Sequence, residues 1–229
     1  MEHKHKTFHL ELSELRTRVT GMGELVIEQF ERALVCLKDH NVSDARTITE
    51  RDVNVNRMDI DVEEICLQFL ALHQPVAGDL RFITAAMKIT TELERIGDRV
   101  VNICEAVADG GGHDPISTEA QVLQIGHLAT AMVRDAMAAF SRSDPALVKS
   151  VWEKDKEFDA LYSHVLPNLV TSLAKDPERI ARDARLALLS KDLNEISEHA
   201  TNIAEVVIFM VEGKELSHMD MYERRPWTD

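Results

Sequence analysis

Cysteine is scarce in this sequence, and its pattern argues against two kinds of site. The three thiols, Cys36, Cys66 and Cys104, are odd in number and form no C-x-x-C pair. A disulfide framework or a thiolate zinc site is therefore not expected, and the usage is typical of a protein inside the cell. We expect all three cysteines to be small buried apolar side chains.

The sequence also lacks an excess of basic residues. It has 26 Lys and Arg against 40 Asp and Glu, a formal net charge of −14. An acidic surface repels a phosphate backbone and an anionic lipid headgroup alike. We therefore expect no nucleic-acid partner and no docking on anionic membranes.

No hydrophobic run is long enough to cross a bilayer. The N-terminal MEHKHKTFHLELSEL carries charges but no apolar core of a signal peptide, and the longest apolar stretch, around AEVVIFMV, is far short of a span. With 45% hydrophobic residues the chain is globular and not a disordered acidic tail. We expect a soluble cytoplasmic protein with no direct membrane insertion.

What the sequence does contain is helical periodicity, and strand-type alternation is nowhere sustained. Apolar residues recur at steps of three and four, which places them on one stripe of a long helix. The first such stripe comprises Phe8, Leu12, Leu15, Val19, Met22, Val26, Phe30, Ala33 and Leu37. Two further stripes follow before residue 105. The pattern predicts an all-α fold.

Turn residues divide the chain into six long helices. Ser43-Asp44 is a candidate cap for the second helix, and Gln74-Pro75 predicts a turn before the third. Gly110 to Gly112 form the strongest break, after which Asp144-Pro145 and Asp176-Pro177 read as helix starts. Short connections make neighbouring helices antiparallel.

We therefore predict a tandem repeat of two antiparallel three-helix bundles. The first repeat covers residues 1–109, a glycine-rich linker 110–114, the second repeat 115–213, and a polar tail 214–229. Pro167 falls inside the fifth helix, where it should cause a kink. The third helices of the two sets have similar sequences, ELERIGDRVVNICEAV from Glu92 and DLNEISEHATNIAEVV from Asp192.

Polar residues four apart recur in the second and third helix of each set. Residues at that spacing share one helix face, and like charges there repel unless a cation lies nearby. In an antiparallel hairpin, residues at one level have a constant sum of sequence numbers. With turns at Pro75 and near Asp176-Pro177, this register aligns two quartets. They are Asp52, Asn56, Glu94 and Asp98 in the first hairpin, and Asp155, Asp159, Asn194 and Glu198 in the second.

Two explanations suit such quartets. Acidic residues at helical spacing commonly form nothing more than a solvated face, and this chain is acidic throughout. Two quartets in register and repeated across the duplication favour a metal site instead. An oxygen-only ligand set suits Mg²⁺, Mn²⁺ or oxidised iron, and it does not suit zinc.

Several motifs resemble the PhoU family of phosphate-uptake regulators over nearly the whole chain. They are TRVTGMGELV near the start, QPVAGDLR from Gln74, LERIGD from Leu93, NIAE from Asn202 and VEGKELSH near the end. The resemblance implies two three-helix bundles with metal clusters held by E/D-x-x-x-D motifs, which fall on the two quartets. It also implies a homodimer and a non-enzymatic adaptor between the ATPase subunit of a phosphate ABC transporter and a sensor histidine kinase. Such an adaptor restrains uptake and starvation signalling when phosphate is ample.

The second repeat departs from the family pattern. Where the first has LERIGD, the second has Asn194, Glu195 and Ser197 in place of an acid, an arginine and a glycine. We expect weaker metal binding there, since an amide carries no charge and Arg95 can orient carboxylates whereas Glu195 cannot. Asn56 weakens the first quartet in the same way. We expect His199 to be a surface side chain.

Two alternatives to the adaptor are open. A di-iron enzyme on a helical bundle uses paired Glu-x-x-His motifs that project into the bundle core, but Glu215 to His218 lies in the polar tail. A metal-binding helical scaffold without a regulatory role is the other.

Overall fold

The structure, a computed structural model, describes residues 2–109, 117–173 and 180–214. The first repeat comprises α1 (Glu2–Asp39), α2 (Val42–Arg51), α3 (Val53–His73) and α4 (Ala77–Ala108). The second comprises α5 (Ser117–Arg142), the short 3₁₀ helix η1 (Pro145–Leu147), α6 (Val148–Leu173) and α7 (Ile180–Glu212). The described residues contain no strand, so the predicted all-α class is confirmed.

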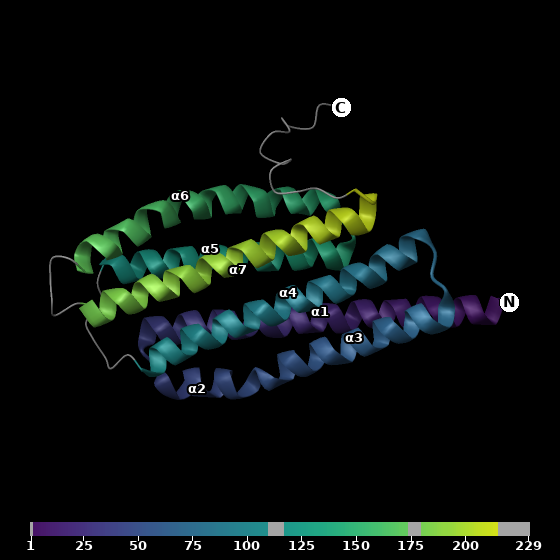
Figure 1. The fold of residues 1–229 in the computed structure, drawn as a ribbon, viewed down its shortest axis with the longest axis horizontal. Coiled ribbons are helices and arrows are strands. Elements are labelled where there is room, and N and C mark those ends of the chain that lie inside the picture. Colours follow the sequence, from purple (N-terminus) through teal and green to yellow (C-terminus); the bar gives the residue numbers. More distant parts are fainter. Residues whose placement is uncertain (1, 110–116, 174–179, 215–229) are drawn as a thin grey trace, which may run out of the picture.

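The helices lie side by side along the length of the molecule (Figure 1). α1 to α4 form one half and α5 to α7 the other, with the extensive contact between α4 and α7 joining them. The predicted linker 110–114 and the Asp176-Pro177 turn lie outside the described residues, as does all of the predicted tail beyond residue 214.

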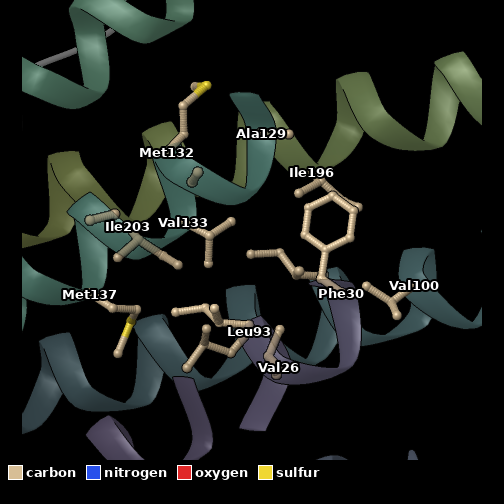
Figure 2. Packing of buried hydrophobic residues seen from close by; sticks show 14 of the residues in the cluster. Val26, Phe30, Leu93, Val100, Ala129, Met132, Val133, Met137, Ile196 and Ile203 are labelled. Atoms are coloured by element: carbon tan, nitrogen blue, oxygen red, sulfur yellow. The ribbon is translucent and has the colours of Figure 1, made fainter. Parts of the chain in front are cut away.

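One hydrophobic core runs through both repeats. Figure 2 shows Phe30 of α1, Leu93 of α4, Val133 of α5 and Ile196 of α7 gathered in the same space. Phe30 and Ile196 are fully buried, and burying one such side chain stabilises the fold by about 1.5–3 kcal/mol. The two halves share this core, so the apolar residues of each half are buried against the other half at their junction.

The predicted second helix is divided in two at Asp52. There the backbone N–H of Asp52 donates to the Thr49 carbonyl at 3.3 Å, three residues back instead of four. The Asp52 dihedrals stay helical, φ −60° and ψ −28°. The chain thus turns more tightly for one residue and resumes as α3, which the apolar periodicity alone did not reveal.

The helix ends agree in part with the predicted turns. The start of α2 is capped by the Asn41 side chain, which accepts from the Asp44 N–H at 3.1 Å, so the predicted Ser43-Asp44 cap was wrong by about one half-turn. Asp144 caps η1 as predicted, accepting from the Ala146 N–H at 2.9 Å. α3 ends before Gln74, which is left-handed at φ 46°. α6 continues through Pro167 as a single bowed helix (Figure 1).

The contact between α4 and α7 repeats itself across the duplication. Asn102 of α4 donates to Asp192 of α7 at 3.0 Å, and Asn202 of α7 donates to Glu92 of α4 at 3.0 Å. Asn102 and Asn202 occupy equivalent positions of the two repeats, 100 residues apart, and so do Glu92 and Asp192. The two hydrogen bonds are related in the same way as equivalent contacts across a two-fold interface, although both helices belong to one chain.

A basic side chain completes each half of this α4–α7 contact, which we name the seam. Arg99 of α4 lies 3.6 Å from Asp192, and its equivalent His199 of α7 lies 2.7 Å from Glu92. The side chain of His199 is only 15% exposed. The prediction that His199 is a surface side chain was therefore wrong, because the α4–α7 contact covers it. The seam gives a structural role to the polar residues that the two repeated sequences, from Glu92 and from Asp192, have in common.

Two arginines of the first repeat bind the carboxyl ends of helices in the second. Arg16 of α1 donates to the Phe140 carbonyl of α5 at 2.8 Å, and Arg81 of α4 donates to the Met210 carbonyl of α7 at 3.2 Å. The Arg16 guanidinium also lies 4.5 Å from the centre of the Phe82 ring. A cation at a helix C-terminus is favourable, so these contacts fix one repeat against the other.

Candidate metal centre

The first quartet is built around the break at Asp52. The Asp52 carboxylate is buried, with 8% of the residue exposed, and it lies against the backbone of α4 at Gly97. A Cβ at Gly97 would stand 3.0 Å from Asp52 Oδ1 and 3.3 Å from Val55 Cγ1. A side chain at position 97 would therefore crowd Asp52 and Val55, and glycine lets the two helices approach this closely. The approach brings Asp52 level with Asp98, the next residue of α4.

Two buried oxygens in this quartet have no hydrogen-bond donor among the described residues. They are Oδ1 of Asp52 and Oδ1 of Asn56. The other Asp52 oxygen, Oδ2, accepts only a long bond of 3.4 Å from Asn56 Nδ2. A buried acceptor without a donor costs about 1–3 kcal/mol, so the arrangement opposes stability and favours any cation that can satisfy both atoms.

The carboxylates of this site also oppose one another. Burial raises the pKa of Asp52, and the nearby charge of Asp98 raises it further. Burial likewise raises the pKa of Glu94, with added contributions from Asp98, Asp59 and Asp52. These raised pKa values indicate that burial and neighbouring negative charge outweigh the partial compensation that Asn56 gives Asp52 and Arg95 gives Glu94.

Asp59 belongs to this cluster, and the sequence reasoning missed it. Its charge acts on Glu94, and it follows Asp52 by seven residues, two helical turns further along the same side of the hairpin. The seven-residue spacing from Asp52 is the signal for Asp59 in the sequence, and the i, i+4 pattern does not include it.

As they lie, the side chains do not enclose an ion. Within the described ranges, no three His, Cys, Asp or Glu side chains converge closely enough to hold a metal. The donor set nevertheless fits a hard cation, since every candidate atom is an oxygen and two of them are buried and unpaired. Metal binding at Asp52, Asn56, Glu94 and Asp98 stays a prediction.

The second quartet resembles the first in burial but differs in its hydrogen bonds. Asp155 of α6 is buried at 7% exposure and Glu198 is exposed, as Asp52 and Asp98 are in the first quartet, and Asp159 is exposed as well. Asn194 donates to Glu198 Oε1 at 2.7 Å, so these two ligand candidates already satisfy each other. Burial, then the charge of Glu198, raises the pKa of Tyr162, which shows that α6 faces α7 at this height.

The residues flanking the second quartet differ as the sequence suggested. Ser197 is buried where the first repeat has Gly97, and its hydroxyl donates to the Asn194 carbonyl at 2.7 Å. Glu195 pairs with Lys191 and with Arg99, at 3.0 Å each. Arg95 Nη1 lies 3.3 Å from Glu92 Oε1. Glu92 is a residue of the seam, so the carboxylate that Arg95 holds is not one of the first quartet.

The remaining candidates are Glu215 with His218 and the three cysteines. Glu215 and His218 lie outside the described residues. Cys36, Cys66 and Cys104 are free and buried, as predicted. Burial raises the pKa of Cys36 to about 11 and those of Cys66 and Cys104 to about 12 each.

The fold and the carboxylate clusters together define a class of duplicated three-helix-bundle proteins. The family model described as the PhoU domain matches the chain twice, at residues 19–107 and 122–207. The chain belongs to the PhoU family. This is a family of regulatory accessory proteins and not of enzymes.

Known relatives are similar over almost the full length. The phosphate-specific transport system accessory protein PhoU homolog of Pseudomonas putida is 35% identical, with 96% of this chain and 86% of the relative covered. The crystal structure of PhoU from Pseudomonas aeruginosa superposes with a TM-score of 0.86 at 35% identity, covering 90% of this chain and all of the other. The crystal structure of the phosphate transport system regulatory protein PhoU from Streptococcus pneumoniae superposes with a TM-score of 0.85 at 28% identity. The match covers 92% of this chain and 99% of the other.

Proposed function

We propose that this protein is a negative regulator of phosphate uptake and of phosphate-starvation signalling. The observation that carries the proposal is the family match in both repeats, together with full-length relatives named as accessory proteins of phosphate-specific transport. Membership of this family gives the chain a role in the regulation of phosphate transport. The direction of that role, restraint in ample phosphate, is our proposal.

The regulator acts as an adaptor between two partners. These are the ATPase subunit of the phosphate ABC transporter and a sensor histidine kinase, and the adaptor works in the cytoplasm as a homodimer. None of the described helices is long and apolar enough to cross a membrane. A continuous core through both repeats suits the role, because a rigid body can hold two partners at a set distance.

Binding to purified partners tests the adaptor directly. The tagged full-length chain, immobilised, is expected to retain the ATPase subunit and the cytoplasmic part of the kinase, each added alone and then together. Retention of neither protein would contradict the proposal. Light scattering on the same preparation measures the mass, and a dimeric mass is expected.

We further propose that the first quartet binds Mg²⁺, Mn²⁺ or iron. Asp52, Asn56, Glu94 and Asp98 would hold the ion, which supplies the positive charge that the cluster lacks. The support is the pair of unpaired buried oxygens and the mutual repulsion of the carboxylates. The second quartet, Asp155, Asp159, Asn194 and Glu198, would bind more weakly because Asn194 and Glu198 are already hydrogen-bonded.

A metal-binding scaffold without regulatory function is the alternative. It predicts metal in the purified protein but no retention of the transporter ATPase or the kinase. A di-iron-type carboxylate enzyme would in addition consume oxygen when loaded with ferrous iron, and the family to which the chain belongs argues against that activity.

A further inference from the structure

The outer face of α3 carries a line of exposed apolar side chains, which we name the α3 stripe. Its members are Val53, Ile60 and Leu67, exposed to 66%, 56% and 52%. They stand seven residues apart, so that each lies two turns beyond the last on the same side of the helix. The stripe is therefore straight and about 21 Å long.

The stripe is separate from the surface that α3 uses to fold. Val55, Val62, Cys66 and Phe69 form the buried side of the helix and face the core. Exposed large apolar residues are also concentrated around α3. Of the eleven among the described residues, six fall between residues 53 and 80. The other five are scattered over α1, α6 and α7, as expected of an ordinary surface.

The seven-residue spacing favours a helix as the occupant. Helices that pack along one another meet at two positions in every seven residues, and Val53, Ile60 and Leu67 occupy one of these two positions, so the line offers one row of apolar contacts to a helix. A flat or extended partner does not present side chains at a seven-residue spacing that would match this line. Helix-in-groove docking of an amphipathic segment uses the same kind of anchor.

Charge beside the stripe decides the chemistry of the occupant. Glu63 and Glu64 are exposed and lie three or four residues from both Ile60 and Leu67, and Asp61 is exposed at the flank of the same face. The exposed Arg57, between Val53 and Ile60, is the one lysine or arginine in α3. A second copy of this face would gather six carboxylates and only two arginines in one interface, and such an excess of like charge is costly. Anionic lipid is disfavoured for the same reason. A basic helix has complementary charge.

We propose that the α3 stripe is a docking site for a basic amphipathic helix of a partner protein. Leucine-type side chains of that helix lie along Val53, Ile60 and Leu67, and its Lys or Arg residues face Asp61, Glu63 and Glu64. The proposal goes beyond the regulatory role, because it stands on the exposed residues of α3 whichever protein supplies the helix.

A designed peptide is the probe. It is a fluorescently labelled 21-residue helix with leucines at seven- and four-residue spacing and lysines on both flanks. A scrambled peptide of equal composition and charge, with no apolar side, is the control. Fluorescence anisotropy gives the affinity of each for the full chain, and hydrogen exchange locates the protected segment. Preferential binding of the amphipathic peptide with protection in α3 is expected.

Variants then test the residues. Ile60→Asp with Leu67→Asp is expected to weaken binding at least tenfold, while Leu188→Asp, at a 65% exposed position of α7, leaves it unchanged. Glu63→Lys with Glu64→Lys should weaken binding most at low salt. All positions are exposed, so unchanged circular dichroism and thermal midpoint show that folding is intact.

Four results overturn the proposal. Three are equal binding of the two peptides, protection away from α3, and an equal loss of binding in the Leu188→Asp control. The fourth is loss of a dimeric mass on Ile60→Asp with Leu67→Asp, since it assigns the stripe to a second copy. Failure of the regulatory role in cells leaves these measurements in place, so the two proposals fail separately.

Discussion

Replacing Arg16 by alanine tests how the two repeats are held together. Arg16 donates to the Phe140 carbonyl at the end of α5, and its guanidinium lies 4.5 Å from the Phe82 ring centre and 5.4 Å from that of Phe140. Its neighbour two residues on, Arg18, forms an exposed pair with Glu14 at 2.7 Å. The two arginines share a helix and a charge but differ in what they contact.

The structure sets the size of the effect. A hydrogen bond from a charged donor is worth about 1.5–3 kcal/mol, the ring contacts about 0.5–2 kcal/mol, and the cation at the helix end about 0.3–1 kcal/mol. These contributions overlap, because one guanidinium makes all of them. We expect Arg16→Ala to lower the free energy of unfolding by about 2–3 kcal/mol. Arg18→Ala should change it by less than about 0.5 kcal/mol, since exposed i, i+4 pairs contribute little.

Urea unfolding followed by circular dichroism measures both variants, and thermal unfolding should show a fall of about 4–12 °C for Arg16→Ala. Arg16→Lys serves as a third variant. It keeps the charge but loses the planar guanidinium, so we expect an intermediate loss. Equal losses in Arg16→Ala and Arg18→Ala would refute the reasoning, because the contacts to α5 would then carry no weight.

Three further predictions follow from the site and the core. Glu94→Ala with Asp98→Ala should remove more bound Mn²⁺ or iron, measured by elemental analysis, than Asn194→Ala with Glu198→Ala; equal losses would count against the asymmetry between the quartets. Asp52→Asn, in chelator-treated protein, should raise the free energy of unfolding at pH 7. The folded-state pKa of Asp52 is raised by burial and by Asp98, so the charged carboxylate lowers stability above that pKa, and the penalty disappears below the unfolded value of about 4. The same variant should therefore have little effect at pH 3.5, and a loss of stability at pH 7 would contradict this. Cys36, Cys66 and Cys104, with pKa values raised by burial to about 11, 12 and 12, should react with a disulfide reagent at pH 8 only after unfolding; fast labelling of the native protein would show that burial does not protect them.

Apolar periodicity was sufficient to predict the fold class. Steps of three and four residues place Val26 and Phe30 on one helix side, and in the structure both are fully buried. The hairpin register followed from the turn at Pro75, because two antiparallel helices of known turn have only one alignment. It correctly brought Asp52 against the Gly97–Asp98 segment of α4.

Other features depend on contacts that periodicity does not encode. The break at Asp52 leaves the dihedrals helical, so it interrupts no pattern of apolar residues. His199 reads as a polar residue on a helix face, and only the crossing of α7 over α4 shows that Glu92 covers it. The contact of Arg16 with α5 joins residues more than 100 positions apart. Pairings of this kind are set by the packing of the two repeats and not by either repeat alone.

Phosphate-starvation signalling in cells that lack this protein tests the regulatory role most directly. The measurement is the activity of a starvation-responsive reporter in high phosphate, in a deletion strain carrying either an empty vector or the full-length chain. We predict that the reporter stays on with the empty vector and is switched off again by the chain. A deletion strain that represses the reporter normally in high phosphate would contradict the role of a negative regulator.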